Sequence, residues 1–178
     1  ALDYSGGVSA ENERGVGRYD RIMGPNGQGQ YRARDLEHAF QILLEHYHYT
    51  YKKPGESRVR ASATQDPNER DICLSPYEGN GGSFDNIGEI FSAEGNQERK
   101  KPFSMRALMS ATIDFDGGHL ERFADLKHGE TAIVWDCDMG GQAVCMIGFE
   151  SKPVDLRGYI PGDGPDLWTG GTLFPQSS

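Results

Sequence analysis

The sequence predicts a mixed α/β fold with long loops, and three observations lead to this prediction. An amphipathic segment that begins after Asp35 is typical of a helix. Two apolar segments that flank residues 140–141 are typical of a β-hairpin. Glycine accounts for 24 of 178 residues, nearly twice its usual share of about 7%, and hydrophobic residues account for only 36%. We therefore expect long irregular connections around a modest core, in one domain or a domain with an appendage.

The net charge of −9 argues against several classes of partner. The longest basic run is Arg99, Lys100 and Lys101, whereas nucleic-acid binding needs a basic surface. An anionic membrane surface is unfavourable for the same reason. No apolar run approaches the roughly 18 residues of a membrane span. We expect no nucleic acid and no membrane among the partners.

The first 30 residues are rich in glycine and are expected to form a loop, with a brief strand at most. A helix follows, with Asp35 as its N-cap. Its apolar residues recur at spacings of 4, 3 and 4, which predicts a single apolar stripe. The stripe consists of Leu36, Phe40, Leu43 and Tyr47. The helix is expected to end near residues 50–53, because Pro54 and Gly55 break it.

Residues 54–101 form a long polar segment without a strong period. Such a segment is typical of a linker, or of a loop held against a partner surface. Within it, Ile72–Leu74 could form a short strand, and residues 86–92 could form one or two helical turns. A second structured unit is expected to begin near Pro102.

The second unit is expected to open with two short helices. Ser104 can cap the first, in which Met105 and Met109 share a face. A turn at residues 114–118 would separate it from a second helix at residues 119–126. The β-hairpin would then follow.

The turn at residues 140–141 also predicts how the two strands of the hairpin pair. Cys137 would lie opposite Val144, and Cys145 opposite Asp136. The two thiols would then point to opposite faces of the sheet, which argues against a disulfide between them. Apolar residues occur on both faces of each strand, so the hairpin is expected to lie in the interior of a layered body.

Two histidines near the end of the expected helix, His46 and His48, invite a metal-binding interpretation. Residues two apart on a helix point in different directions, so packing of an aromatic helix end is the favoured interpretation. The three cysteines, Cys73, Cys137 and Cys145, lack the spacing of zinc or redox sites. They are interpreted as small core residues rather than nucleophiles, and their odd number fits a reducing, cytoplasmic compartment.

Asp136 and Asp138 alternate along one expected strand and could form a cation site or an acid–base pair. Solvated side chains beside a turn are the favoured interpretation of these two carboxylates. Gly15 and Gly17 resemble part of a phosphate-binding loop. No strand–loop–helix pattern follows them, so we reject that function.

The segment WTGGTLFPQSS at residues 168–178 is the remaining candidate site. Gly170 and Gly171 would let the backbone approach a ligand closely, and their N–H groups could face an oxyanion. Leu173 and Phe174 could line an apolar groove. A plain turn explains the same residues equally well, so these residues do not identify a reaction.

Several segments occur in an informative order. The later ones are PFSMRALM, GHLERFADL, TAIVWDCDMGGQAVCMIGFESKP, YIPGDGPD and GGTLFPQSS. The earlier ones, which match more loosely, are GGVS, RDLEHAFQILLEHY and DPNERDICLSPYE. In this order the segments resemble the carboxyltransferase component of biotin-dependent acyl-CoA carboxylases, of the acetyl-CoA carboxylase type.

The resemblance implies a partial crotonase-like (ClpP/crotonase) spiral of strand–strand–helix units. It also implies that the chain is a middle fragment of such a protein. Residues 1–53 would be the end of the first carboxyltransferase subdomain and its following helix, and residues 54–101 a linker. Residues 102–178 would be the start of the second subdomain. The remaining segments of the carboxyltransferase would lie before and after this chain.

The resemblance further implies an activity of the parent protein, in which a carboxyl group moves from carboxybiotin to an acyl-CoA such as acetyl-CoA or propionyl-CoA. Such ligases serve fatty acid biosynthesis. Biotin would be carried on a separate carrier domain, and the fragment would bind no cofactor by itself. The glycine motifs that form the family's oxyanion holes lie outside this sequence, so the fragment alone is expected to be inactive.

For this chain, the resemblance places Gly170, Gly171, Leu173 and Phe174 near the acyl-CoA cleft as substrate-binding residues. No catalytic residue and no metal ligand is assigned, and a homo-oligomer is expected. Leu173 stands where the family has Trp, which leaves the choice of acyl chain open. The alternative is a non-catalytic binding or scaffold module with a degenerate crotonase-like surface, favoured by the loop-rich acidic composition.

Overall fold

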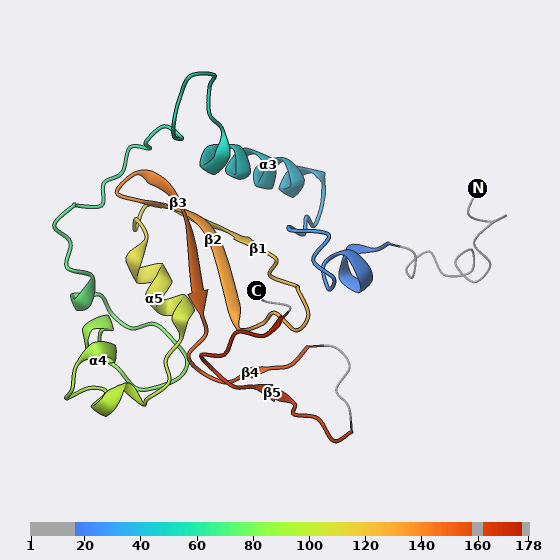
Figure 1. The fold of residues 1–178 in the computed structure, drawn as a ribbon. Helices are drawn as coiled ribbons and strands as arrows, with labels where there is room; N and C mark the ends of the chain where they lie inside the picture. Colours follow the sequence, from blue (N-terminus) through green and yellow to red (C-terminus); the bar gives the residue numbers. More distant parts are fainter. Residues whose placement is uncertain (1–16, 158–161, 176–178) are drawn as a thin grey trace.

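A computed structural model describes residues 17–157 and 162–175 of the chain. In this part of the chain helices and antiparallel sheets are mixed, which confirms the predicted α/β character at that level. One sheet has the strand order β1-β2-β3, and a smaller sheet pairs β4 with β5 (Figure 1). The strands are β1 His119–Arg122, β2 Ala132–Met139, β3 Gln142–Phe149, β4 Val154–Asp155 and β5 Leu167–Trp168.

The α-helices of the described residues are α3 Leu36–Thr50, α4 Ile87–Phe91 and α5 Met105–Thr112. Shorter helical turns are η2 Tyr19–Met23, η3 Ile72–Leu74 and η4 Gln97–Arg99. The predicted caps are confirmed. Asp35 accepts the backbone N–H of His38 at 2.8 Å, and Ser104 accepts that of Ala107 at 3.4 Å. Within residues 17–157 and 162–175, no helix is long and apolar enough to cross a membrane.

Two of the short turns correct the sequence-based expectations. Tyr19–Met23, expected as loop or brief strand, form a π-helical turn. Ile72–Leu74, expected as a strand, form a 3₁₀ turn instead. The side chain of Asp71 accepts the backbone N–H of Cys73 at 3.0 Å, and Ser75 N–H donates to Ile72 O at 3.0 Å. These local bonds satisfy the backbone without a neighbouring strand.

The β-hairpin forms in the predicted register. Cys137 pairs with Val144 and Asp136 pairs with Cys145. Gly140 and Gly141 have φ of 59° and 73°, which is the left-handed conformation that a two-residue turn requires. All three cysteines are free, in agreement with the prediction that no disulfide joins the two strands.

The expected helix at residues 119–126 is wrong, because its first half forms strand β1. His119–Arg122 pair antiparallel with β2, and Leu120, which is 7% exposed, lies opposite Asp136. The ladder supplies the backbone hydrogen bonds that a helix would have supplied. Phe123 has a φ of 59°, a conformation that ends the strand and excludes a helix through this position.

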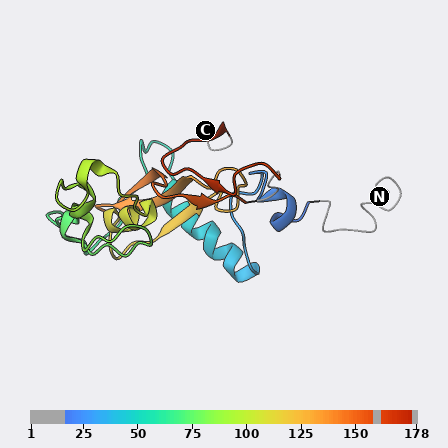
Figure 2. The same cartoon turned by 90° about the horizontal axis from the view of Figure 1, so that it is seen from below.

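The three-stranded sheet is covered on its two faces by different helices (Figures 1 and 2). On one face, Met109 of α5 packs against Ile133 and Trp135 of β2. On the other face, His48 of α3 reaches Asp138 of β2. A second core cluster surrounds α4 and consists of Phe84, Ile87 and Ile90.

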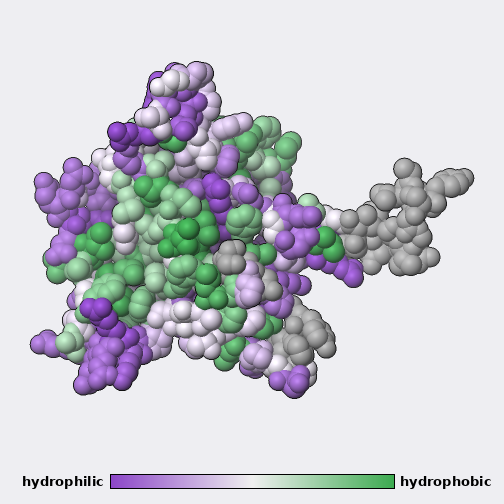
Figure 3. All heavy atoms as spheres, in the orientation of Figure 1, coloured by the Kyte–Doolittle hydropathy of each residue, from purple (hydrophilic) through white to green (hydrophobic). Residues whose placement is uncertain are grey.

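The predicted apolar stripe of α3 exists, but it is not buried. Leu36 is 74% exposed, Phe40 57% and Leu43 43%. Only the last turns of the helix meet the sheet, and the N-terminal half projects away from the rest of the molecule (Figure 2). Hydrophobic residues are accordingly visible at the surface, both over α3 and over the sheet (Figure 3).

The hairpin is interior only in its first strand. β2 is the central strand, and most of its residues are buried. β3 is an edge strand, in which Ile147 is 61% exposed and Phe149 41% exposed. The expectation that both strands lie in the interior is therefore wrong for β3.

Candidate functional site

The glycine pair predicted from sequence forms a tight bend that packs on the exit of the hairpin. The N–H of Gly171 donates to Glu150 O at 2.6 Å. A Cβ at Gly170 would overlap the carbonyl oxygen of Ser151, so only glycine fits there. Gly171 has a φ of 72°, which also favours glycine. The bend is thus a place where backbone approaches backbone.

Aromatic side chains stand beside this bend. The rings of Trp168 and Phe174 have their centroids 3.9 Å apart, at an angle of 38°. Trp168 Nε1 donates to Glu130 Oε2 at 2.7 Å, which fixes the indole against the start of the hairpin. Leu173 is 48% exposed. The substrate-binding role of these residues stays a prediction, and residues 176–178 of the same motif lie outside the described part.

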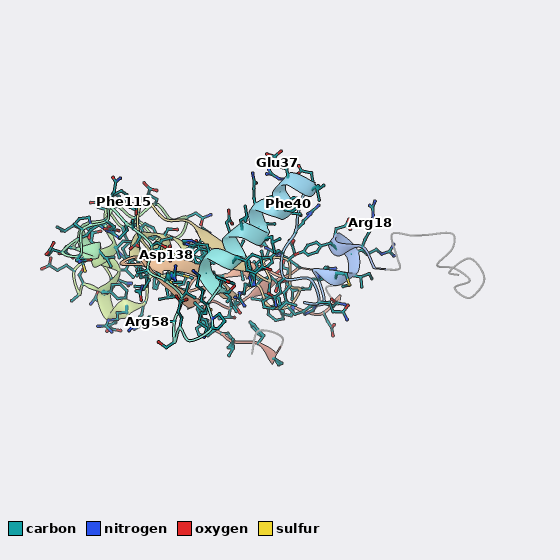
Figure 4. All side chains as sticks on the ribbon, turned by 90° about the horizontal axis from the view of Figure 1, so that it is seen from above. Arg18, Glu37, Phe40, Arg58, Phe115 and Asp138 are labelled. Atoms are coloured by element: carbon teal, nitrogen blue, oxygen red, sulfur yellow. The ribbon has the colours of Figure 1, made fainter. Side chains whose placement is uncertain are left out.

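The structure brings together a second group of residues that the sequence analysis did not assemble, near the tip of the hairpin, where Asp138 lies (Figure 4). His48 Nε2 lies 2.7 Å from Asp138 Oδ2, although the two residues are 90 positions apart. Asp138 is only 7% exposed. Asp136 is also buried, and Arg122 Nε donates to its Oδ2 at 2.6 Å. The favoured interpretation of both carboxylates as solvated side chains is therefore wrong.

The hairpin turn is held in place from two sides. The carboxylate of Asp114 accepts the N–H groups of Gly140 and Gly141 at 2.6 and 2.7 Å. The N–H of Ser62 donates to Gly141 O at 2.7 Å. A Cβ at Gly141 would overlap Ser62 O, so this close packing also requires glycine. These contacts fix the position of Asp138 one strand residue away from the turn.

The His48–Asp138 pair does not make a serine nucleophile. An ionised carboxylate only accepts hydrogen bonds, so Nε2–H of His48 donates to Asp138. Ser62 Oγ lies 3.3 Å from that same nitrogen. A serine triad needs the carboxylate on one ring nitrogen and the hydroxyl on the other. Here one nitrogen meets both groups, so Ser62 is not activated and its hydroxyl proton is left for another acceptor.

A cavity of about 270 Å³ opens between the end of α3 and the loop that follows it. Its polar and aromatic walls consist of Tyr47, His48, Tyr51, Lys53, Glu56, Arg60 and Ser62. Aromatic surface, a hydroxyl, an imidazole, two cations and one carboxylate thus converge on one cavity. Such convergence of polar groups on a concave, partly apolar surface is typical of small-molecule sites.

Burial holds two titratable groups near the hairpin in the neutral form, the Cys137 thiol and the Tyr49 hydroxyl. Burial raises the pKa of the Cys137 thiol to about 11, and the nearby Asp138 and Asp136 add to this effect. Burial also raises the pKa of the Tyr49 hydroxyl to about 12. Cys137 is fully buried and therefore fits the predicted core role, with no thiolate at neutral pH. Cys73 and Cys145 are exposed, so for them the core interpretation is wrong.

The aromatic end of α3 packs as the sequence suggested. His46 Nδ1 lies 3.4 Å from the hydroxyl of Tyr31, and Tyr49 donates to Gly118 O at 3.1 Å. Across residues 17–157 and 162–175, no three His, Cys, Asp or Glu side chains gather as metal ligands would.

No model of a known protein family matches this sequence, and no curated protein matches it.

Proposed function

We propose that the chain is part of a carboxyltransferase that moves a carboxyl group from carboxybiotin to an acyl-CoA. One observation carries this proposal: within the described residues, three of the segments that resemble the family pack together. The hairpin, α5 and the bend at residues 170–171 are distant in sequence, yet α5 packs on β3 and Gly171 hydrogen-bonds to Glu150. The paired strands, with α5 packed on one face, are also compatible with a unit of the crotonase-like spiral that we propose for the parent protein.

The proposed reaction has three steps. Carboxybiotin releases CO₂, the resulting biotin anion removes a proton from the α-carbon of the acyl-CoA, and the enolate attacks CO₂. Backbone N–H groups can stabilise the negative charge on the thioester oxygen. In this proposal Gly170, Gly171, Leu173 and Phe174 line the acyl-CoA cleft, and the catalytic groups come from other segments of the parent. A separate carrier domain presents the biotin.

The test is made in the full-length parent protein. Replacement of Gly170 by Ala would push the bend away from Ser151, and we expect kcat/KM for acyl-CoA carboxylation to fall about tenfold or more, or by about 1.4 kcal/mol in transition-state binding. Gly118→Ala is the matched control, because a Cβ there meets open space. An absence of carboxyl transfer with acetyl-, propionyl- and longer acyl-CoA would defeat the proposal.

The alternative is a non-catalytic binding or scaffold module, and the exposed apolar face of α3 favours it. The same assay separates the two, since a scaffold would show no acyl-CoA-dependent turnover. For either function we propose a cytoplasmic location and a homo-oligomer, because all three cysteines are free and apolar surface is exposed.

A further inference from the structure

The loop after α3 has a charge opposite to that of the whole chain. Between residues 52 and 60 it carries four basic side chains and one acidic one, whereas the net charge of the chain is −9. The basic residues are Lys52, Lys53, Arg58 and Arg60. In Figure 3 this loop is a hydrophilic projection at the top of the molecule. A local reversal of charge on an acidic protein favours an anionic ligand at that place.

The single carboxylate of the loop is already used to brace it. Glu56 Oε1 accepts Arg60 Nε at 2.9 Å, and Glu56 Oε2 accepts the backbone N–H of Lys53 at 2.9 Å. Among the residues that the structure describes, Lys52, Lys53 and Arg58 form no ion pair. Arg60 is ion-paired with Glu56, with its Nη2 also 2.8 Å from Oε1, but it keeps further N–H donors, because a guanidinium has five. The loop thus has a fixed shape, and three of its basic side chains form no ion pair within the described residues.

The cavity of about 270 Å³ lies directly under this loop. Its floor is fixed, because His48 is held by Asp138 and the backbone of Ser62 is held by Gly141. Its aromatic wall consists of Tyr47 and Tyr51, whose rings meet edge to face with centroids 6.2 Å apart. The volume is slightly below the roughly 300–1,000 Å³ of sites for drug-sized ligands, so a small ligand fits best.

We propose that this cavity binds a small phosphorylated molecule that carries a planar ring. The phosphate would meet Lys53, Arg60 and the free hydroxyl proton of Ser62, since basic side chains and hydroxyls are the usual partners of phosphate oxygens. The ring would lie against Tyr47 and Tyr51. This site is separate from the bend at residues 170–171, and the proposal does not depend on the carboxyltransferase proposal.

The proposal is tested by titrating phenyl phosphate into the 178-residue chain at low ionic strength, with binding followed by calorimetry and amide NMR shifts. Phenol and inorganic phosphate are titrated in parallel. We expect saturable binding of phenyl phosphate, tighter than the binding of phenol or of inorganic phosphate. The amide NMR shifts should change in residues 47–62. No saturable binding of phenyl phosphate would overturn the proposal. Equal affinity for inorganic phosphate would overturn the ring part of it, and equal affinity for phenol the phosphate part.

Two variants locate the binding. Lys53→Gln removes an unpaired charge while the backbone bond from residue 53 to Glu56 remains, and we expect a loss of about tenfold in affinity for phenyl phosphate and none for phenol. Tyr51→Leu is expected to weaken binding of phenyl phosphate but not of inorganic phosphate. Arg18→Gln is the control, because Arg18 lies far from Arg58 and the loop (Figure 4). An equal loss in this control would show binding to net charge alone and would refute the site.

Discussion

At the scale of single residues, Asp114 is the anchor of the hairpin turn. It is 5% exposed, and its carboxylate accepts two N–H groups from Gly140 and Gly141. Its own N–H donates to Asp138 O at 3.0 Å. The side chain of Asp114 therefore connects the end of α5 to the turn, and its backbone N–H binds the main-chain carbonyl of Asp138, the residue whose carboxylate holds His48.

Replacement of Asp114 by Ala should destabilise the protein substantially. The turn would lose two hydrogen bonds to a charged acceptor, and the buried N–H of Gly141 would be left without its partner. We expect the free energy of unfolding to fall by about 3 kcal/mol. Urea unfolding followed by circular dichroism measures this change. Asp155→Ala, at an exposed position of β4, is the control and should change stability by less than about 0.5 kcal/mol. A loss of equal size in both variants would contradict the anchoring role.

A second residue-scale prediction concerns alkaline pH. Burial raises the pKa of Cys137 from 9.0 to about 11, so the unfolded chain loses this proton before the folded chain does. The contribution of the protonated thiol to the free energy of unfolding is therefore fully present below pH 9, and it is lost as the pH rises to 11. From this thiol alone we expect a decline of about 1.4 kcal/mol per pH unit in that window. Tyr49, whose pKa is raised from 10.0 to about 12, should steepen the decline above pH 10 and extend it to higher pH.

The pH dependence is measured as urea unfolding at several pH values from neutral to alkaline. Cys137→Ala removes the ionising group and should flatten the decline in the lower part of the window. Cys145→Ala, which removes an exposed thiol, should leave it unchanged. An unchanged slope in Cys137→Ala would show that this thiol titrates normally in the folded protein.

The candidate site at the hairpin tip shows what residue-scale reasoning could not reach. His48 was recognised as part of an aromatic helix end, and Asp138 as one of two carboxylates beside a turn. Their pairing depends on where α3 crosses the sheet, which no local pattern specifies. One feature of the sequence does indicate that these carboxylates are paired. Asp136 and Asp138 lie in a strand that is apolar on both faces, and carboxylates in such a strand need buried partners.

At the scale of elements, prediction succeeded where local bonds determine the structure. Asp35 caps α3 and Ser104 caps α5, as their side-chain chemistry requires, and the glycine pair at residues 140–141 specifies the register of the hairpin. Strand β1 was missed because GHLERFADL has a helical pattern of apolar residues. Pairing with β2 overrides that local preference, and a pairing partner beyond the turn is not visible in a short segment.

The apolar face of α3 and the apolar face of α5 should respond differently to mutation. Phe40 of α3 is 57% exposed, whereas Met109 of α5 is 3% exposed and packs on Ile133 and Trp135. We expect Phe40→Ala to change the free energy of unfolding by less than about 0.5 kcal/mol. We expect Met109→Ala to cost about 2–5 kcal/mol, because it opens a cavity in the core.

Urea unfolding of the two variants, each against the unaltered chain, measures the contrast. A loss of several kcal/mol in Phe40→Ala would mean that the apolar stripe of α3 is covered in solution. The comparison thus tests directly whether the exposed stripe is a surface of the folded protein.

At the scale of the whole molecule, apolar surface remains open on two adjoining parts. One is the stripe of α3, and the other is the edge strand β3 with Ile147 and Phe149. The net charge of −9 keeps copies of the chain apart at long range. β3 itself carries no charged residue and no proline, the usual protections of a sheet edge. Short-range pairing at this edge is therefore not opposed by the strand's own side chains.

We expect the chain to associate with itself as concentration rises, through the outer edge of β3. Among the described residues, the backbone groups of Cys145 and Ile147 that face away from β2 have no backbone partner, so a second strand can pair with them. Sedimentation velocity over a range of concentrations measures the association. Ile147→Lys places a charge on the edge and should shift the population to monomer. Leu74→Lys, at a 76% exposed position outside the sheet, adds the same charge and should leave association intact. If the unaltered chain sediments as a monomer throughout, or if both variants dissociate it equally, the edge is not the contact, because net charge alone would then explain the behaviour.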